Sequence, residues 1–131
     1  GGTHVERWGE SHDSDVAYRS EVFGYLVREL GRRNIAFLFA RESQESPRVG
    51  PDLKAAFGGP FIANQKLSPA EGATLLAAGQ ADAISWGQLY IANPDLPERI
   101  AGGTALNAPN PDTFYGGGAE GYTDYPVRGE G

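Results

Sequence analysis

The chain has 131 residues, which suits one domain better than two. Its net charge is −6 and its basic residues are scattered, so we expect no nucleic-acid or anionic-membrane surface. It has no Cys and no visible signal peptide or apolar run of the ~20 residues that span a membrane, so we expect a cytoplasmic protein without membrane contacts.

The first 12 residues show little periodicity, and we predict an irregular lead-in over residues 1–12. His4 and His12 lie in this polar stretch, where solvated side chains are more usual than metal ligands, so we predict no metal site. A helix should follow, because Asp13, Ser14 and Asp15 offer N-cap oxygens. Its apolar residues form one stripe, and the glycine at position 31 suits its end; the stripe comprises Val22, Phe23, Leu26, Val27 and Leu30.

Three short apolar runs then alternate with helical stretches. The runs are Ile35–Ala40, Pro60–Ala63 and Ala83–Trp86, and such runs are typical of strands buried on both faces of a parallel sheet. The helical stretches are residues 52–57, residues 68–79 with a capping box formed by Ser68 and Glu71, and residues 95–101. Asp95 is expected to cap the last helix, and Asp82 to be a polar residue at a strand edge.

The strands begin about 24 residues apart, with a helix in each gap. This repeat predicts an α/β fold with a parallel sheet, either an open doubly wound sheet or a closed (β/α)8 barrel. Three such strands cannot bury themselves, and a barrel needs eight. The pattern therefore predicts further structure from a longer parent chain or from partner chains.

Ligands of parallel α/β folds bind at the carboxyl ends of the strands. Ala63 and Asn64 lie at the end of the second predicted strand, and Gly87 and Gln88 follow the third. These two pairs are candidates for a phosphate site. The alternative is that Asn64 and Gly87 are ordinary turn formers. Arg41 with Glu42 follows the first run, where a solvated loop pair is the more ordinary interpretation, and no Ser-His-Asp arrangement is visible.

Two long motifs carry a specific resemblance: GQLYIANPDLPERI at 87–100 and LNAPNPDTFYGGGAEGYTDYP at 106–126. With VFGYLVRELGRRNIAFLFARE at 22–42 and LKAAFGGPFIANQ at 53–65, they resemble the C-terminal part of the Old Yellow Enzyme family, whose members are FMN-dependent, NAD(P)H-using ene-reductases built on a (β/α)8 TIM barrel. The resemblance covers residues 13–126, implies about the sixth to eighth βα units, and leaves residues 127–131 as a tail.

The resemblance implies cofactor-binding residues in the loops after the seventh and eighth strands. Ala63 and Asn64 by their backbone, and Gly87 with Gln88, would contact the FMN phosphate. The family usually has Arg at the last of these positions, which forms a charged fork to phosphate. Gln88 can donate a hydrogen bond but brings no charge.

The resemblance also implies roles for the aromatic residues near the end of the chain. Phe114 would pack near the dimethylbenzene edge of the flavin, and Tyr115 would border the substrate pocket. The glycines at 116–118 would allow close approach of the backbone and positive φ. The alternative is a simple aromatic latch that closes the barrel.

By resemblance, the activity is hydride transfer from NAD(P)H through FMN to an activated, α,β-unsaturated alkene. The family's catalytic residues lie on the first five βα units, so we predict no catalytic residue in this chain and no ene-reductase activity for it alone. The expected partners are the N-terminal part of the barrel or a second chain, a small-molecule substrate, and possible homo-oligomers. The alternative function is a non-catalytic βα-repeat module, or oligomerising fragment, that does not bind flavin.

Overall fold

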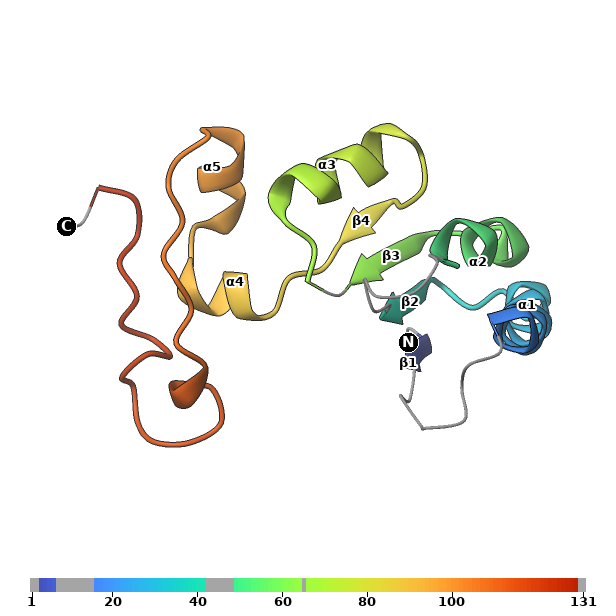
Figure 1. Cartoon of the computed structure of the whole chain (residues 1–131), viewed down its shortest axis with the longest axis horizontal. Coiled ribbons are helices and arrows are strands. Elements are labelled where there is room, and N and C mark those ends of the chain that lie inside the picture. The colour runs from blue at the N-terminus through green and yellow to red at the C-terminus, as the bar shows by residue number, and fades with distance from the viewer. Residues whose placement is uncertain (1–2, 7–15, 42–48, 65, 130–131) are drawn as a thin grey trace. The chain divides into compact units, whose positions relative to one another are not determined.

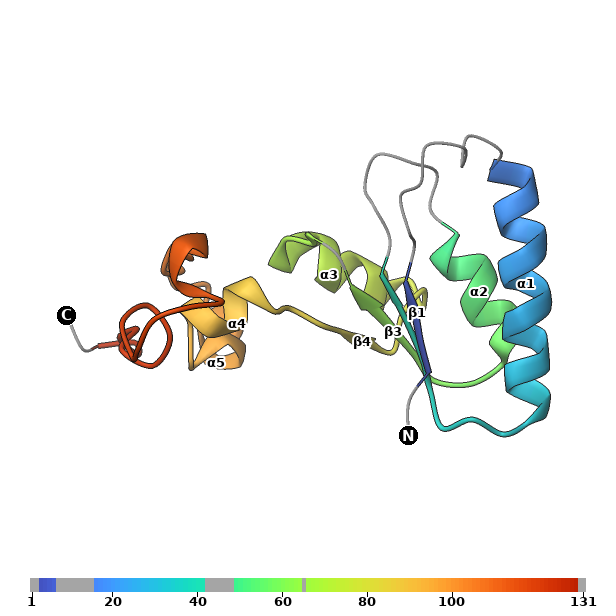
Figure 2. The same ribbon diagram turned by 90° about the horizontal axis from the view of Figure 1, so that it is seen from below.

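The structure is a computed structural model that describes residues 3–6, 16–41, 49–64 and 66–129 (Figures 1 and 2). The chain divides into two compact units, residues 1–85 and residues 86–131. The first unit contains the parallel sheet, and the second contains two short helices and the aromatic segment.

A four-stranded parallel sheet in the order β1-β2-β3-β4 forms the first unit. Its strands are β1 (Thr3–Glu6), β2 (Leu38–Arg41), β3 (Phe61–Asn64) and β4 (Ala83–Ile84). Three helices connect them: α1 (Val16–Arg32), α2 (Gly50–Phe57) and α3 (Pro69–Ala77). The predicted alternation of strand and helix is confirmed.

The prediction of an irregular lead-in over residues 1–12 is wrong for residues 3–6. This segment forms β1 and pairs in parallel with β2, from Thr3 opposite Leu38 to Glu6 opposite Arg41. It is too short and too polar to show an apolar pattern, so its strand conformation depends on the neighbouring strand rather than on local sequence. The sheet consequently has four strands within the described residues, where three were predicted.

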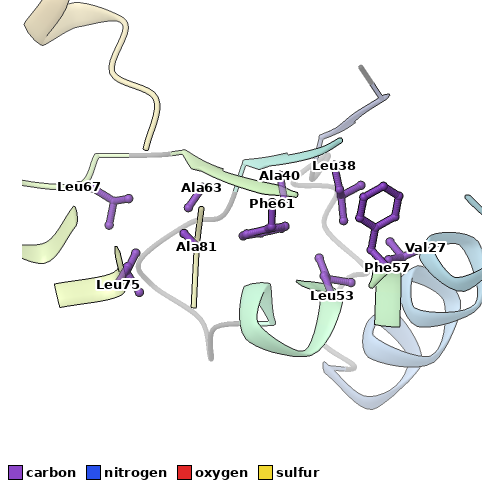
Figure 3. Close-up of a cluster of buried hydrophobic side chains, with 10 residues drawn as sticks. All are labelled: Val27, Leu38, Ala40, Leu53, Phe57, Phe61, Ala63, Leu67, Leu75 and Ala81. Carbon is purple, nitrogen blue, oxygen red and sulfur yellow. The ribbon is translucent and has the colours of Figure 1, made fainter. Parts of the chain in front are cut away.

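The buried core lies between one face of the sheet and the three helices (Figure 3). Alternate residues of β2 and β3 point into it, namely Leu38, Ala40, Phe61 and Ala63, each at most 6% exposed. Helices and loops supply the rest of the cluster: Val27, Leu53, Phe57, Leu67, Leu75 and Ala81. Helices α1 and α2 lie side by side over the sheet (Figure 2).

The opposite face of the sheet is only partly covered. Phe39, Ile62 and Ala83 are in register across three strands; the first two are half-buried and the third is exposed. Among the described residues the strands are thus buried on one face only, which agrees with the prediction that they need further structure to be buried on both faces. No second layer covers this apolar row among the described residues, so the long apolar runs in the sequence reflect a face that a closed barrel would bury.

Helix α1 is present as predicted, but its end and its buried face differ from prediction. It continues through Gly31 to Arg32, and the left-handed residue after it is Asn34, with φ of 53°. Gly31 is needed for a different reason: a Cβ there would lie 2.3 Å from the carbonyl oxygen of Phe57 at the end of α2. Of the predicted apolar stripe, Val22 and Leu26 are 45% and 42% exposed.

The capping box of α3 is confirmed. Glu71 N–H donates to Ser68 Oγ at 3.2 Å, and Ser68 N–H donates to Glu71 Oε2 at 2.8 Å. These bonds satisfy two backbone donors that lack partners at a helix start.

Substituting Ser68→Ala should lower the free energy of unfolding by about 1 kcal/mol, because the N-cap acceptor is lost. Urea unfolding followed by circular dichroism measures this change. Thr74→Ala, in the same helix, removes a side-chain bond to Ala70 O and gains helix propensity, so it should not lower the free energy of unfolding. Equal losses in the two variants would contradict a specific role for the cap.

The second unit contains α4 (Gln88–Ala92), α5 (Leu96–Ala101) and the short 3-10 helix η1 (Pro111–Thr113) (Figure 1). Helix α5 confirms the prediction for residues 95–101, whereas α4 was not predicted. Among the described helices, none combines the length and apolar character that crossing a bilayer requires.

Candidate functional site

Ala63 and Asn64 lie at the carboxyl end of β3, as predicted. The carbonyl oxygen of Ala63 accepts a bond from Ser85 N–H at 2.9 Å, and Asn64 Nδ2 donates to Ser85 Oγ at 3.3 Å. Asn64 pairs with Arg41 of β2 across the sheet. The Asn64 amide is thus oriented by the segment after β4, at the edge where ligands of parallel α/β folds bind.

Gly87 and Gln88 lie at the start of α4 in the second unit. Both are exposed, and a Cβ added to Gly87 would meet no atom within 4 Å. The backbone here is open to an approaching group, and the Gln88 amide can donate hydrogen bonds but has no charge. A phosphate could therefore approach these two residues, but they would bind it only through uncharged hydrogen-bond donors.

Phe114 and Tyr115 are adjacent in sequence but have opposite environments. Phe114 directly follows η1 and is 9% exposed, whereas Tyr115 is 99% exposed. Their ring centroids are 6.3 Å apart with an interplanar angle of 88°, an edge-to-face pair. Of the three glycines that follow, only Gly117 has positive φ, at 92°. The segment therefore buries one ring and presents the other.

Asn93 and Asn107 form a buried polar pair that sequence patterns did not reveal. Asn93 is 0% exposed; its Nδ2 donates to Leu89 O at 2.9 Å, and its Oδ1 accepts from Asn107 N–H at 2.7 Å. Asn107 Nδ2 donates to the carbonyl oxygens of Ala92 and Pro126, each at 2.9 Å. These bonds join α4 to the segments before and after the aromatic residues.

Asp95 lies at the N-cap position of α5, as predicted, but its side chain makes no capping hydrogen bond. Its Oδ1 accepts from Arg99 Nε at 2.7 Å and its Oδ2 from Arg128 N–H at 2.7 Å. Burial by itself raises the pKa of the Asp95 carboxyl, but these two bonds outweigh it, so the pKa lies below its ordinary value. The i, i+4 spacing of Asp95 and Arg99 was the sequence signal for this pair.

An open surface pocket of about 390 Å³ lies at the amino ends of the strands, away from the carboxyl ends that carry Asn64. Lys54 and Asp82 lie in its wall; Lys54 Nζ donates to Gly79 O at 2.8 Å and to Asp82 Oδ1 at 3.1 Å. Asp82 Oδ2 accepts from Phe61 N–H at 2.8 Å, so Asp82 lies at the strand edge as predicted. In (β/α)8 barrels, residues at the amino ends of the strands usually contribute to stability, whereas ligands bind at the carboxyl ends.

Lowering the pH should destabilise the first unit through Asp82. The bond from Phe61 N–H, and then the bond from Lys54, lower the pKa of the Asp82 carboxyl. A carboxyl with a lowered folded-state pKa stabilises the fold above its unfolded pKa, and this contribution disappears as the pH falls through the folded value. We expect the urea midpoint to drop below about pH 4. In Asp82→Asn the urea midpoint should drop less at acid pH than in the unaltered protein. If the two proteins showed the same dependence on pH, Asp82 would not be the group responsible.

The predicted site residues thus form three local groups: Ala63 with Asn64 in the first unit, and Gly87 with Gln88, and Phe114 with Tyr115, in the second. Among the described residues, no group of three or more His, Cys, Asp or Glu side chains could hold a metal ion. His4 lies in β1, whereas His12 and Glu42 lie outside the described residues.

Parts of several known proteins are similar to this chain in sequence and in fold. Over 105 residues it is 38% identical to a probable flavin mononucleotide-dependent alkene reductase of Leishmania infantum, a match that covers 78% of this chain and 29% of that protein. It superposes on morphinone reductase in complex with tetrahydroNAD with a TM-score of 0.84 and 36% identity, over 96% of this chain and 35% of that one. No protein-family model matches the chain.

A third relative is the old yellow enzyme from Trypanosoma cruzi, with a TM-score of 0.85 and 27% identity over 97% of this chain and 35% of that one. The fold is therefore that of the last βα units of a (β/α)8 barrel, which confirms the predicted fold class. In sequence and in fold the chain matches part of known Old Yellow Enzyme family members and flavin alkene reductases, as its motifs indicated. It spans about a third of the length of the relatives it matches.

Proposed function

We propose that this chain supplies the C-terminal βα units of an FMN-dependent NAD(P)H oxidoreductase. The reaction would move a hydride from NAD(P)H through FMN to an activated alkene. The observation that carries the proposal is the match to morphinone reductase over 96% of this chain at 36% identity. When bound, FMN supplies the hydride chemistry, and this chain contributes binding and orientation.

The proposed phosphate contacts come from the strand ends. Ala63 and Asn64 would contact FMN through their backbone, and the bond from Asn64 Nδ2 to Ser85 supports a fixed position for this turn. Gly87 would allow close approach because no atom surrounds its Cβ position, and Gln88 would donate a neutral hydrogen bond. The aromatic pair would act at the other end of the cofactor, with Phe114 beside the flavin and Tyr115 at the pocket rim.

The partner we propose is the remainder of the barrel, as part of the same protein or as a second chain. The half-covered row formed by Phe39, Ile62 and Ala83 supports this, because a closed barrel fills that face with side chains from all its strands. Exposed Val22 and Leu26 on α1 support a further helix at that position.

Native mass spectrometry of the protein as purified tests the proposal. The expected result is an assembly that contains the rest of the barrel and one FMN, and that reduces an activated alkene with NAD(P)H. The isolated 131-residue chain should show no such activity, because the family's catalytic residues are not among its motifs. A stable, flavin-free homo-oligomer would instead support the alternative function, a non-catalytic βα-repeat module. The observation that favours this alternative is that Gln88 is uncharged.

A further inference from the structure

A buried arginine in the second unit touches both ends of the aromatic loop, which we define as residues 108–125. The Arg99 side chain is only 7% exposed. Its Nη1 donates to Ala105 O, which precedes the loop, and its Nη2 donates to Pro126 O, which follows the loop, each at 2.8 Å. Its Nε bonds to Asp95, so one guanidinium joins both ends of the loop to α5.

Asn107 and Arg128 complete this junction. We call the junction the loop stem and define it as Ala105, Asn107, Pro126 and Arg128. Asn107 Nδ2 donates to Pro126 O at 2.9 Å, the same oxygen that accepts from Arg99. Arg128 N–H donates to Asp95 Oδ2 at 2.7 Å. The segment before the loop and the segment after it are therefore both bonded to the side chains of Arg99 or Asp95, and they are also bonded to each other.

Hydrogen bonds link the two halves of the aromatic loop to each other. Asn110 N–H donates to the Tyr125 hydroxyl at 2.9 Å, and Thr113 Oγ1 donates to Gly121 O at 3.0 Å. A Cβ at Gly121, whose φ is +65°, would lie 2.2 Å from Thr113 Oγ1, so the loop closes tightly at this point. A displacement of the loop stem would therefore carry Phe114 with it.

We propose that Arg99 is a positioning residue that sets where the aromatic loop places Phe114 and Tyr115. A guanidinium presents its donors in a fixed planar fork, so it fixes the direction of both stem segments, whereas a lysine ammonium acts as a single flexible point charge. A buried cation without partners would be costly, and here the three hydrogen bonds and the Asp95 carboxylate compensate it. The effect of Arg99 on flavin rests on the proposed function, but its effect on the loop does not.

Hydrogen exchange on the full chain with Arg99→Lys tests the proposal. The variant keeps the charge beside Asp95 but loses the two-pronged contact to the loop stem. We expect the amides of Asn110, Gly121 and Arg128 to exchange at least about tenfold faster, since two charge-assisted hydrogen bonds are lost. The Gly102 amide, bonded to Glu98 O within α5, should change by less than about twofold.

Each other outcome overturns the proposal. Unchanged exchange in the loop would mean that Lys positions it equally well, and equal acceleration of the loop and of Gly102 would mean a general role in folding. Arg99→Gln is the second variant; if both variants unfold α5, Arg99 is a folding residue only. Leu75→Ala, in the first unit, is the matched control, because it loses buried contacts and should leave loop exchange unchanged.

A second measurement uses the flavin-containing protein. If the loop carries Phe114 and Tyr115 to the flavin, Arg99→Lys should shift the visible absorption band of the flavin and raise KM more than it lowers kcat. If the loop amides of Arg99→Lys exchanged faster but the flavin absorption band did not shift, the proposed effect of Arg99 on the flavin would be overturned. A protein that contains no flavin would overturn the proposed function, while the exchange result would still decide whether Arg99 positions the loop.

Discussion

Replacing Gly31 with Ala should lower the free energy of unfolding by about 1–3 kcal/mol, although Ala is the better helix former. The added Cβ would lie 2.3 Å from the backbone oxygen of Phe57, and backbone at the end of α2 cannot rotate away as a side chain can. Helices α1 and α2 would have to separate, and Val27, Leu53 and Phe57 would lose part of their packing.

Gly24 in the same helix provides a matched control. A Cβ there would meet only the end of the Arg28 side chain at 3.3 Å, which can move. Gly24→Ala should therefore raise the free energy of unfolding by about 0.5–1 kcal/mol through helix propensity. Urea unfolding of both variants compares the signs directly. Stabilisation by both substitutions would mean that the contact between Gly31 and Phe57 has no energetic consequence.

In the proposed flavin-containing assembly, Gln88→Arg should tighten FMN binding by about tenfold or more. The substitution adds a cation at a position that we assign to the phosphate, and a hydrogen bond to a charged group contributes about 1.5–3 kcal/mol. The position is exposed at the start of α4, so the larger side chain can be accommodated without loss of packing. Quenching of flavin fluorescence during titration measures the affinity.

Two controls isolate the phosphate contact. Riboflavin lacks the phosphate, so its affinity should be the same in the unaltered protein and in Gln88→Arg. Gln80→Arg introduces the same charge at an exposed position of the first unit, near the amino ends of the strands. If Gln80→Arg tightens FMN binding as much as Gln88→Arg, the gain comes from net charge alone, and position 88 does not contact the phosphate.

The resemblance identified three groups of candidate residues, but it did not identify the interactions that hold them in place. No sequence pattern singled out Asn93 or Asn107, yet Asn93 is fully buried and bonds to Asn107. Bonds between residues 14 or more positions apart, such as this one and the contact of Arg99 with Pro126, follow from how the chain returns on itself. No local pattern encodes such contacts.

The sequence by itself determined the features that depend on near neighbours along the chain. The apolar runs that became β2, β3 and β4 are visible as a local pattern, and the capping box at Ser68 rests on hydrogen bonds between residues three positions apart. The motif around Phe114 was also sufficient to indicate the family.

Only the tertiary structure decided the features that depend on distant neighbours. Thr3–Glu6 became a strand because β2 offered a paired edge, and Gly31 is required because α2 approaches α1. The apolar runs suggested two buried faces, but burial depends on what covers a face, and the described residues fully cover only one face of the sheet. Periodicity can show which residues are apolar, whereas packing determines which of them are buried and against what.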